Sequence, residues 1–462
     1  MNVARPATLP TRDTALLSAG NSPAELTATE FRAAFAARQV SALEYVSACL
    51  DRVERLDHAV HAWKTFDRAA AEQRAKIVDA RKPGSRADER LGGVPVGVKD
   101  IFNTYDFPTG MGSPIMEHYT PGNDARSVSD VRLSGGIILG KTVTAEFAVH
   151  NPGPTLNPWD IARTPGTSSS GSAVAVATRM VSVALATQTA GSIIRPASYC
   201  GIYGFKPSFG LIPRTGILKT TDTLDTVGFL SRSIDDLALM FEACRVRGHN
   251  YPVSEAALND ATRQNVSGRP WRVGVVKGPK SGFEVPAVAS GIAATARKLA
   301  DAGCDVFEYQ LSPIYSEIHD LHETIYRRAL AYYFQLEWGS QAELFSPVMQ
   351  DMIKRGLAIS PQDYIAAVEQ QQKHQHRFDA DCAAYDILLS PSTADEAPVG
   401  IESRDLPDHC LIWTFAGAPV IGIPALSGSG GLPVGLQLVA RRFNDYKLLA
   451  FAKFASELLL TK

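Results

Sequence analysis

The chain has 462 residues, of which 45% are hydrophobic and 20% are charged, and its formal net charge at pH 7 is −2. This composition indicates a folded protein with a sizeable core and excludes a disordered chain. The near-neutral charge gives no electrostatic reason to expect binding to nucleic acid or to an anionic membrane.

Residues 1–23 are rich in proline, threonine and serine and contain no apolar run of signal-peptide length, so we expect an arm and a cytoplasmic protein. Residues 24–81 repeat apolar positions at helical spacing, which predicts a helical layer. Within it, Ser41 and Glu44 have the spacing of a capping box and mark a helix start. Six cysteines without CxxC spacing indicate neither a disulfide framework nor a zinc site.

Short apolar strands alternate with helices after residue 82, which predicts an α/β sandwich with a mixed, largely parallel sheet between helices. The predicted strands include a segment ending at Lys99 and residues 137–140, 183–186, 271–276, 387–391 and 420–424. The predicted helices include residues 124–134, 173–181, 234–244 and 287–302, together with a long, aromatic-rich helical region over 314–380.

Two turns of small residues flank the predicted helix 173–181 and strand 183–186. The first is the serine-dense segment 167–172, and the second is the segment 188–192, which ends at Ser192. A helix packed beside a strand can bring the two turns together, so that two hydroxyl groups face each other. A serine hydroxyl is a poor nucleophile unless a base removes its proton.

Lys99 is the best candidate for this base, because it ends an apolar, β-branched run in the segment 92–100. Burial disfavours the charged form of a lysine and lowers its pKa from about 10.4 toward neutrality. A neutral Lys99 can accept a proton.

At these residues the chain resembles the amidase signature family of Ser–cis-Ser–Lys hydrolases. The family pattern is a lysine in a GVKD-like strand end, a GGSSGGS-like turn and a DTGGSIR-like turn, and all three are matched in this order. Segments 43–81, 157–159 and 432–439 also resemble the family, so the likeness covers nearly the whole chain. It implies the amidase signature fold, with residues 1–81 as an N-terminal arm and helical layer of the same unit and residues 82–462 as the catalytic domain.

Carried over by position, the resemblance makes Ser192 the nucleophile, Ser168 the cis-serine and Lys99 the base of a proton relay. It leaves open whether the peptide bond before Ser168 is cis. Ser169 is expected to support the first turn by hydrogen bonding. No cofactor and no metal are implied. The expected oxyanion-hole donors are the backbone N–H groups of Thr189, Ala190, Gly191 and Ser192.

Two groups of departures from the family pattern stand out. Gln188 and Ile194 replace the usual aspartate and arginine around the nucleophile, and an arginine follows one position later, at Arg195. Losing an acid and a base together would avoid a buried unpaired charge. Thr167 and Ser170 replace glycines that are common in the first turn.

The resemblance implies a hydrolase of amides and related acyl bonds, such as carbamates (urethanes), aryl amides and esters, of the urethanase or aryl acylamidase type. We expect a small-molecule amide or carbamate substrate, no nucleic acid, no membrane and a possible homodimer. The alternative is a glutamine-hydrolysing subunit of a tRNA-dependent amidotransferase, which works only with partner chains. The departures at Gln188 and Ile194 favour the stand-alone enzyme.

Two pairs of histidines lie in the region 314–380. His319 and His322 are one helical turn apart but lack an HExxH pattern and a third ligand, so we expect ordinary helix-face residues rather than a metal site. His374 and His376 are expected to face solvent.

Overall fold

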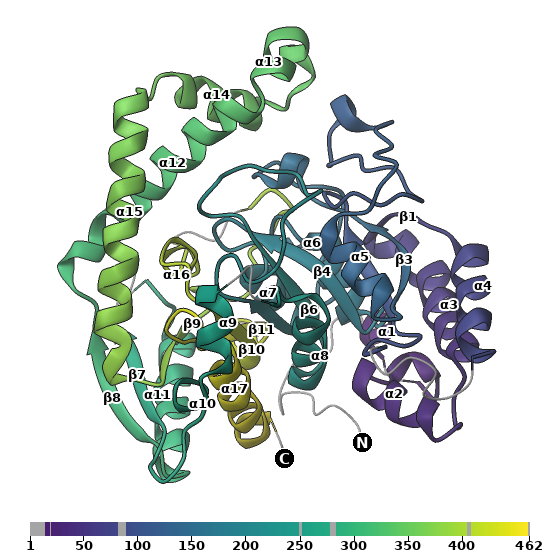
Figure 1. Cartoon of the computed structure of the whole chain (residues 1–462), viewed down its shortest axis with the longest axis horizontal. Helices are drawn as coiled ribbons and strands as arrows, with labels where there is room; N and C mark the ends of the chain where they lie inside the picture. Colours follow the sequence, from purple (N-terminus) through teal and green to yellow (C-terminus); the bar gives the residue numbers. More distant parts are fainter. Residues whose placement is uncertain are drawn as a thin grey trace.

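A computed structural model describes residues 14–18, 20–81, 89–248, 252–277, 283–403 and 408–460. These residues form one sheet of eleven strands with helices around it (Figure 1). In chain order the strands are β1 (Trp63–Phe66), β2 (Pro95–Lys99), β3 (Ile137–Thr142), β4 (Val183–Gln188), β5 (Tyr203–Lys206), β6 (Thr226–Ser231), β7 (Arg272–Lys277), β8 (Asp305–Gln310), β9 (Ile387–Pro391), β10 (Val420–Ser427) and β11 (Pro433–Val439).

The order of strands in the sheet is β1-β3-β2-β4-β6-β5-β10-β11-β9-β7-β8. Parallel pairs lie toward its two flanks, in β3–β2–β4 and in β9–β7–β8, whereas the strands between them pair antiparallel. Parallel neighbours need crossover connections, and the chain supplies helices between β2 and β3 and between β3 and β4. The predicted mixed α/β sheet is confirmed, with its parallel pairing confined to these flanks.

The first helices in chain order are α1 (Thr14–Leu17), α2 (Ala28–Ala36), α3 (Ala42–Val60), α4 (Arg68–Asp79), α5 (Arg126–Leu133), α6 (Ser170–Ala177), α7 (Ile194–Cys200), α8 (Ile234–Cys244) and α9 (Pro252–Asn259). They are followed by α10 (Ala261–Gln264), α11 (Pro286–Asp301), α12 (Ile318–Tyr333), α13 (Gln335–Gln341), α14 (Pro347–Leu357), α15 (Pro361–Asp381), α16 (Leu411–Phe415) and α17 (Asp445–Leu460). Short 3-10 turns are η1 (Pro23–Glu25), η2 (Pro114–Met116), η3 (Glu146–Ala148), η4 (Pro313–Glu317), η5 (Ala342–Leu344) and η6 (Cys382–Ala384).

Two regions of helices lie at opposite ends of the sheet. In Figure 1, α3 and α4 lie at the β1 end, whereas α12, α14 and α15 form a long helical arm at the other end. Between them, α6 and α7 pack on each other and on the sheet, as do α8 and α17. No described helix is both long and apolar enough to span a bilayer.

The N-terminal helical layer is present as predicted. Ser41 caps α3: its hydroxyl accepts from the Glu44 N–H at 3.1 Å, while the Glu44 carboxylate accepts from the Ser41 N–H at 2.8 Å. The described end of the expected arm is packed, because Leu16 and Leu17 of α1 are buried. Residues 1–13 lie outside the described residues, and so does the segment 82–88 at the expected domain boundary, which stays a prediction.

Helix α6 begins at Ser170, three residues before the predicted start, and every residue in it is buried. Its Ser172 hydroxyl bonds the Thr142 hydroxyl at 2.7 Å and the Leu185 carbonyl at 3.1 Å, which ties the helix to β3 and β4. A Cβ added at Gly171 would lie 2.3 Å from the Ala62 carbonyl oxygen. At Gly171 helix α6 therefore packs directly against the backbone of Ala62 and Val143.

Replacing Gly171 by alanine is expected to lower the free energy of unfolding by about 1–3 kcal/mol, because backbone cannot move aside as a side-chain end can. Denaturant unfolding followed by circular dichroism measures this. Gly339→Ala is the matched helical control, since no atom lies within 4 Å of its added Cβ. Equal midpoints for the two variants would contradict the packing described for α6.

Candidate active site

Lys99 lies at the end of β2 and its side chain is fully buried. Its Nζ lies within hydrogen-bond distance of three hydroxyl oxygens: Ser168 Oγ at 2.7 Å, Ser169 Oγ at 3.0 Å and Thr187 Oγ1 at 2.9 Å. The structure therefore brings the predicted base to two adjacent serines of the first turn, Ser168 and Ser169. Thr187, near the end of β4, is a partner that the sequence did not indicate.

Burial lowers the pKa of Lys99 to about 7, against the opposing effect of the Asp225 carboxylate, which favours the charged form. Asp225 is itself held in place, because it accepts hydrogen bonds from the Thr189 hydroxyl at 2.8 Å and from the N–H groups of Thr220 and Thr221. A substantial fraction of Lys99 is neutral at physiological pH. Lys99 is thus buried and has a lowered pKa, as expected from the sequence.

The first turn is fixed by backbone and hydroxyl contacts. The peptide bond between Thr167 and Ser168 is cis. The Ser168 carbonyl accepts from the Ala145 N–H at 3.3 Å. Ser169 donates its hydroxyl proton to the Thr187 carbonyl at 3.2 Å, so it can only accept from Lys99. Among the three hydroxyl groups around the lysine, this leaves those of Ser168 and Thr187 with protons that can be directed at Nζ.

The second turn joins β4 to α7, and Gln188 organises its interior. The Gln188 side-chain oxygen accepts from the Ile193 N–H at 2.9 Å and the Ile194 N–H at 3.0 Å. Its side-chain nitrogen donates to Thr414 Oγ1 at 2.9 Å. A fully buried, neutral amide thus caps the first N–H groups around the start of α7, where the family pattern has an aspartate.

Arg195 links the two turns. Its guanidinium forms an ion pair with Asp408 and donates to the Thr167 carbonyl at 3.4 Å. Burial raises the pKa of Asp408, but the Arg195 charge and backbone N–H groups outweigh it and hold that pKa below its usual value. The suggestion that an acid and a base are lost together is wrong: the arginine moves by one position and pairs with an acid from a distant segment.

Ser192 is half-buried in the turn before α7. The N–H groups of Thr189, Ala190, Gly191 and Ser192 donate no hydrogen bond to the described residues. Such donors remain available for a negatively charged oxygen next to Ser192.

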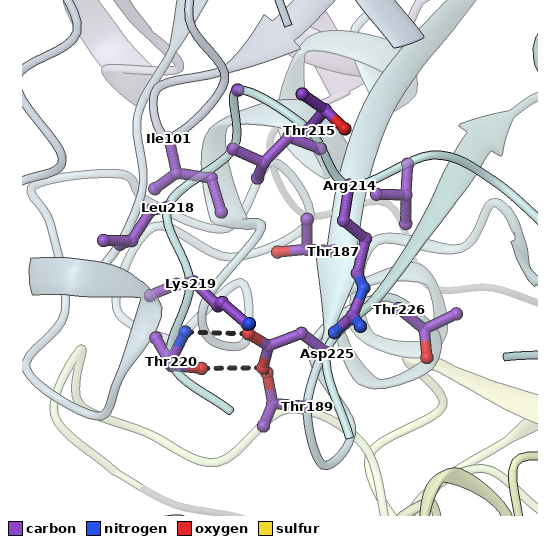
Figure 2. A pocket seen from close by; sticks show the side chains of 14 residues that line it. Ile101, Thr187, Thr189, Arg214, Thr215, Leu218, Lys219, Thr220, Asp225 and Thr226 are labelled. Carbon is purple, nitrogen blue, oxygen red and sulfur yellow. Dashed lines mark hydrogen bonds between the residues drawn. The ribbon is translucent and has the colours of Figure 1, made fainter. Parts of the chain in front are cut away.

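Two cavities reach this turn. One, of about 360 Å³, is lined by Thr187, Thr189 and Asp225, and Figure 2 shows Asp225 hydrogen-bonded to Thr220 within it. The other, of about 590 Å³, is lined by Ala190 among other residues and lies against α12 and α14. Successive residues of the second turn therefore line different cavities.

The histidines differ from expectation. His322 is 2% exposed, and its Nε2–H donates to the Thr189 carbonyl at 2.8 Å. Burial lowers the pKa of His322 to about 4, so the ring is neutral. The prediction that His374 faces solvent is wrong, because it is buried and bonds Glu317 at 3.1 Å, whereas His376 is exposed. No cluster of metal-ligating side chains occurs among the described residues.

Replacing Gln188 by methionine is expected to lower the free energy of unfolding by about 1–3 kcal/mol, because two buried N–H groups lose their acceptor. Gln188→Met should also lower the rate of hydrolysis by the folded enzyme, since these N–H groups follow Ser192 directly. Gln350→Met on α14, which removes a single side-chain hydrogen bond to the Phe345 carbonyl, is the control. Equal effects of both substitutions on unfolding and on turnover would contradict the capping described for Gln188.

A buried lysine hydrogen-bonded to two serines at the end of an interior strand of a mixed sheet is the arrangement expected of a serine hydrolase whose candidate base is a lysine. The family model described as Amidase matches residues 44–449, so the chain belongs to the amidase signature family, as its motifs indicate. It is therefore a hydrolase of the amidase class that acts on C–N bonds.

Relatives and solved structures match more than nine-tenths of the chain. A glutamyl-tRNA(Gln) amidotransferase subunit from Acidothermus cellulolyticus is 35% identical over 472 residues, 91% of this chain and 92% of the relative. The native peptide amidase of Stenotrophomonas maltophilia has a TM-score of 0.78 at 28% identity, covering 94% of this chain and 97% of that one. A chain from an "unexpected vestigial protein complex" related to an s-triazine catabolic enzyme has a TM-score of 0.82 at 25% identity, covering 94% and 98%.

These relatives correct one expectation. We predicted a small-molecule amide or carbamate substrate and no nucleic acid. Relatives that match nearly the whole chain are described as one subunit of an amidotransferase named for glutamyl-tRNA(Gln). The prediction is therefore wrong, and the near-neutral net charge of the chain did not indicate this.

Proposed function

We propose that this chain is the glutamine-hydrolysing subunit of a tRNA-dependent amidotransferase. The observation that carries the chemistry is the 2.7 Å hydrogen bond between the buried Lys99 Nζ and Ser168 Oγ, next to the turn that bears Ser192. The similarity to a glutamyl-tRNA(Gln) amidotransferase subunit over 91% of the chain supports the assembly and the acceptor.

The proposed reaction begins with neutral Lys99. The Ser168 hydroxyl passes its proton to Lys99 Nζ while it takes the proton of Ser192, whose oxygen attacks the side-chain carbonyl of glutamine. Collapse of the tetrahedral intermediate breaks the C–N bond, and the relay returns the proton to nitrogen, so that ammonia leaves. Water then hydrolyses the acyl-Ser192 ester to glutamate and restores the serine.

The other groups of the site have supporting roles in this proposal. The N–H groups of Thr189, Ala190, Gly191 and Ser192 form the oxyanion hole, which usually contributes about 2.7–4 kcal/mol per donor to transition-state binding. Ser169 holds Lys99 in place from one side, and Thr187 does so from the other, at 3.0 and 2.9 Å. The ammonia is consumed by the partner chains, which attach it to the glutamyl group on the tRNA.

The test is reconstitution. The chain is co-expressed with the other amidotransferase subunits of its own host, and glutamine-dependent conversion of glutamyl-tRNA to glutaminyl-tRNA is measured with and without each chain. We expect conversion only with all subunits and only with intact Ser192. The proposal is overturned if the chain alone turns over acyl anilides or nitrophenyl carbamates faster than glutamine and the mixture forms no glutaminyl-tRNA.

A further inference from the structure

Three successive carbonyl groups of the second turn, those of residues 189–191, each accept a hydrogen bond. The Thr189 carbonyl accepts from His322 Nε2–H at 2.8 Å and the Ala190 carbonyl accepts from the Thr414 hydroxyl at 2.7 Å. The Gly191 carbonyl accepts from the Arg195 N–H at 2.9 Å. Three successive peptide units are thereby fixed by three donors.

Fixing these carbonyls also orients the opposite side of each peptide unit. A peptide bond is planar and nearly always trans, so the C=O of one residue and the N–H of the next point in opposite directions. Holding the carbonyls of Thr189, Ala190 and Gly191 therefore aims the N–H groups of residues 190, 191 and 192 away from their anchors. These are three of the four N–H groups proposed above as oxyanion-hole donors.

Two of the three anchors come from distant parts of the chain. His322 lies on α12, 133 residues from Thr189, and Thr414 lies on α16, 224 residues from Ala190. Both side chains are buried, and Thr414 also accepts from the Gln188 amide. A neutral imidazole in its Nε2–H form is a donor that needs no proton from solvent, and burial keeps it neutral by lowering the pKa of His322 to about 4.

We propose that His322 and Thr414 are positioning residues that preorganise the oxyanion hole by holding the carbonyls of Thr189 and Ala190. The inference rests on the proposed function, because it gives those N–H groups a substrate oxygen to meet. Neither residue reacts with the substrate. A misplacement of about 1 Å in such donors can lower a rate by about 100-fold.

The experiment measures the rate at which a fluorophosphonate labels Ser192, with the site identified by mass spectrometry. Labelling needs the nucleophile and the oxyanion hole but neither glutamine nor tRNA. The variants are His322→Leu, which removes the donor, His322→Gln, which keeps an N–H at similar reach, and Thr414→Val, which removes the hydroxyl at constant shape. Tyr45→Phe is the control, because it removes a buried side-chain donor to the Leu26 carbonyl in the N-terminal layer.

We expect His322→Leu and Thr414→Val to slow labelling by about 10–100-fold. His322→Gln should recover most of the rate, and Tyr45→Phe should lose stability without slowing labelling. With an amide substrate, the same variants should lower kcat more than they raise KM, since the contact matters in the transition state.

The failures are distinguishable. If the wild type is not labelled at Ser192, the proposed function fails. If the wild type is labelled and His322→Leu and Thr414→Val match its rate, the positioning inference is overturned. It is also overturned if Tyr45→Phe slows labelling as much as they do, because the effect would then follow stability, or if His322→Gln is as slow as His322→Leu.

Discussion

Replacing Ser192 by alanine is expected to lower kcat/KM for amide hydrolysis by about 10⁴-fold or more, because no acyl-enzyme can form. Any rate that survives would come from substrate binding and from the oxyanion hole, which together can retain catalysis above the rate in water. The same variant should form no covalent adduct with a fluorophosphonate. Initial rates of ammonia release, measured with a coupled assay, and intact-protein mass spectrometry provide the two readouts.

Ser170→Ala is the matched control for this experiment. Ser170 is a buried serine of the first turn, and its hydroxyl makes no hydrogen bond within the described part of the chain. We expect turnover close to that of the wild type. The assignment of Ser192 as nucleophile is wrong if Ser192→Ala keeps more than about 1% of the wild-type activity while the labelled serine is found elsewhere.

The parts of the site that the sequence predicted are those set by local chain chemistry. A lysine at the end of the apolar strand β2 becomes buried because that strand lies inside the sheet, and this was visible as an uninterrupted apolar run before Lys99. The two small-residue turns were recognised by composition and by their resemblance to the family pattern. The α3 start at Ser41 was likewise predicted, because the two halves of a capping box lie three residues apart.

The parts that the sequence did not predict depend on contacts between distant segments. His322 and Thr414 reach the nucleophile turn only because α12 and α16 pack beside it, and neither carries a motif. The expectation at Arg195 was also wrong. The arginine and its acidic partner were expected to be lost together, but Arg195 lies one position later and pairs with Asp408, 213 residues away. His374 was expected to face solvent, yet it packs against Tyr315 and Phe415 in the interior.

Replacing Lys99 by methionine is expected to remove general-base catalysis, lowering kcat/KM by about 10²–10⁴-fold. The wild-type rate should rise with pH through the pKa of about 7, because only the neutral amine accepts the proton from Ser168. The variant should lack this acidic limb. A pH–rate profile of glutamine hydrolysis by the assembled enzyme between pH 5.5 and 8.5 measures it, and a limb that persists near pH 7 in the variant would assign the titration to another group.

Lys206 provides the control, since burial lowers its pKa to about 7 as well while its Nζ bonds only the carbonyls of Pro207 and Ala418 in the described structure. Between pH 7 and the unfolded value of 10.5, the unfolded chain holds a proton that each folded lysine has lost. Stability therefore rises with pH by about 1.4 kcal/mol per unit for each lysine, and the cost of charging the buried amine is fully present below pH 7.

Lys99→Met and Lys206→Met should each remove one such slope, relative to the wild type, from the unfolding free energy measured between pH 7 and 8.5. Unfolded cysteines, with a pKa of about 8.5, begin to titrate in this window in all three proteins alike, so their contribution cancels in the comparison. Only Lys99→Met should also remove the acidic limb of the rate profile. Burial alone gives both lysines a lowered pKa, but of the two only Lys99 has hydroxyl partners: Ser168 and Ser169 in the first turn, and Thr187 near the end of β4, just before the turn that bears Ser192. A buried neutral lysine thus acts as a base only where a hydroxyl group lies beside it. The two variants separate the effect of lysine burial on the unfolding free energy from its effect on the rate of hydrolysis.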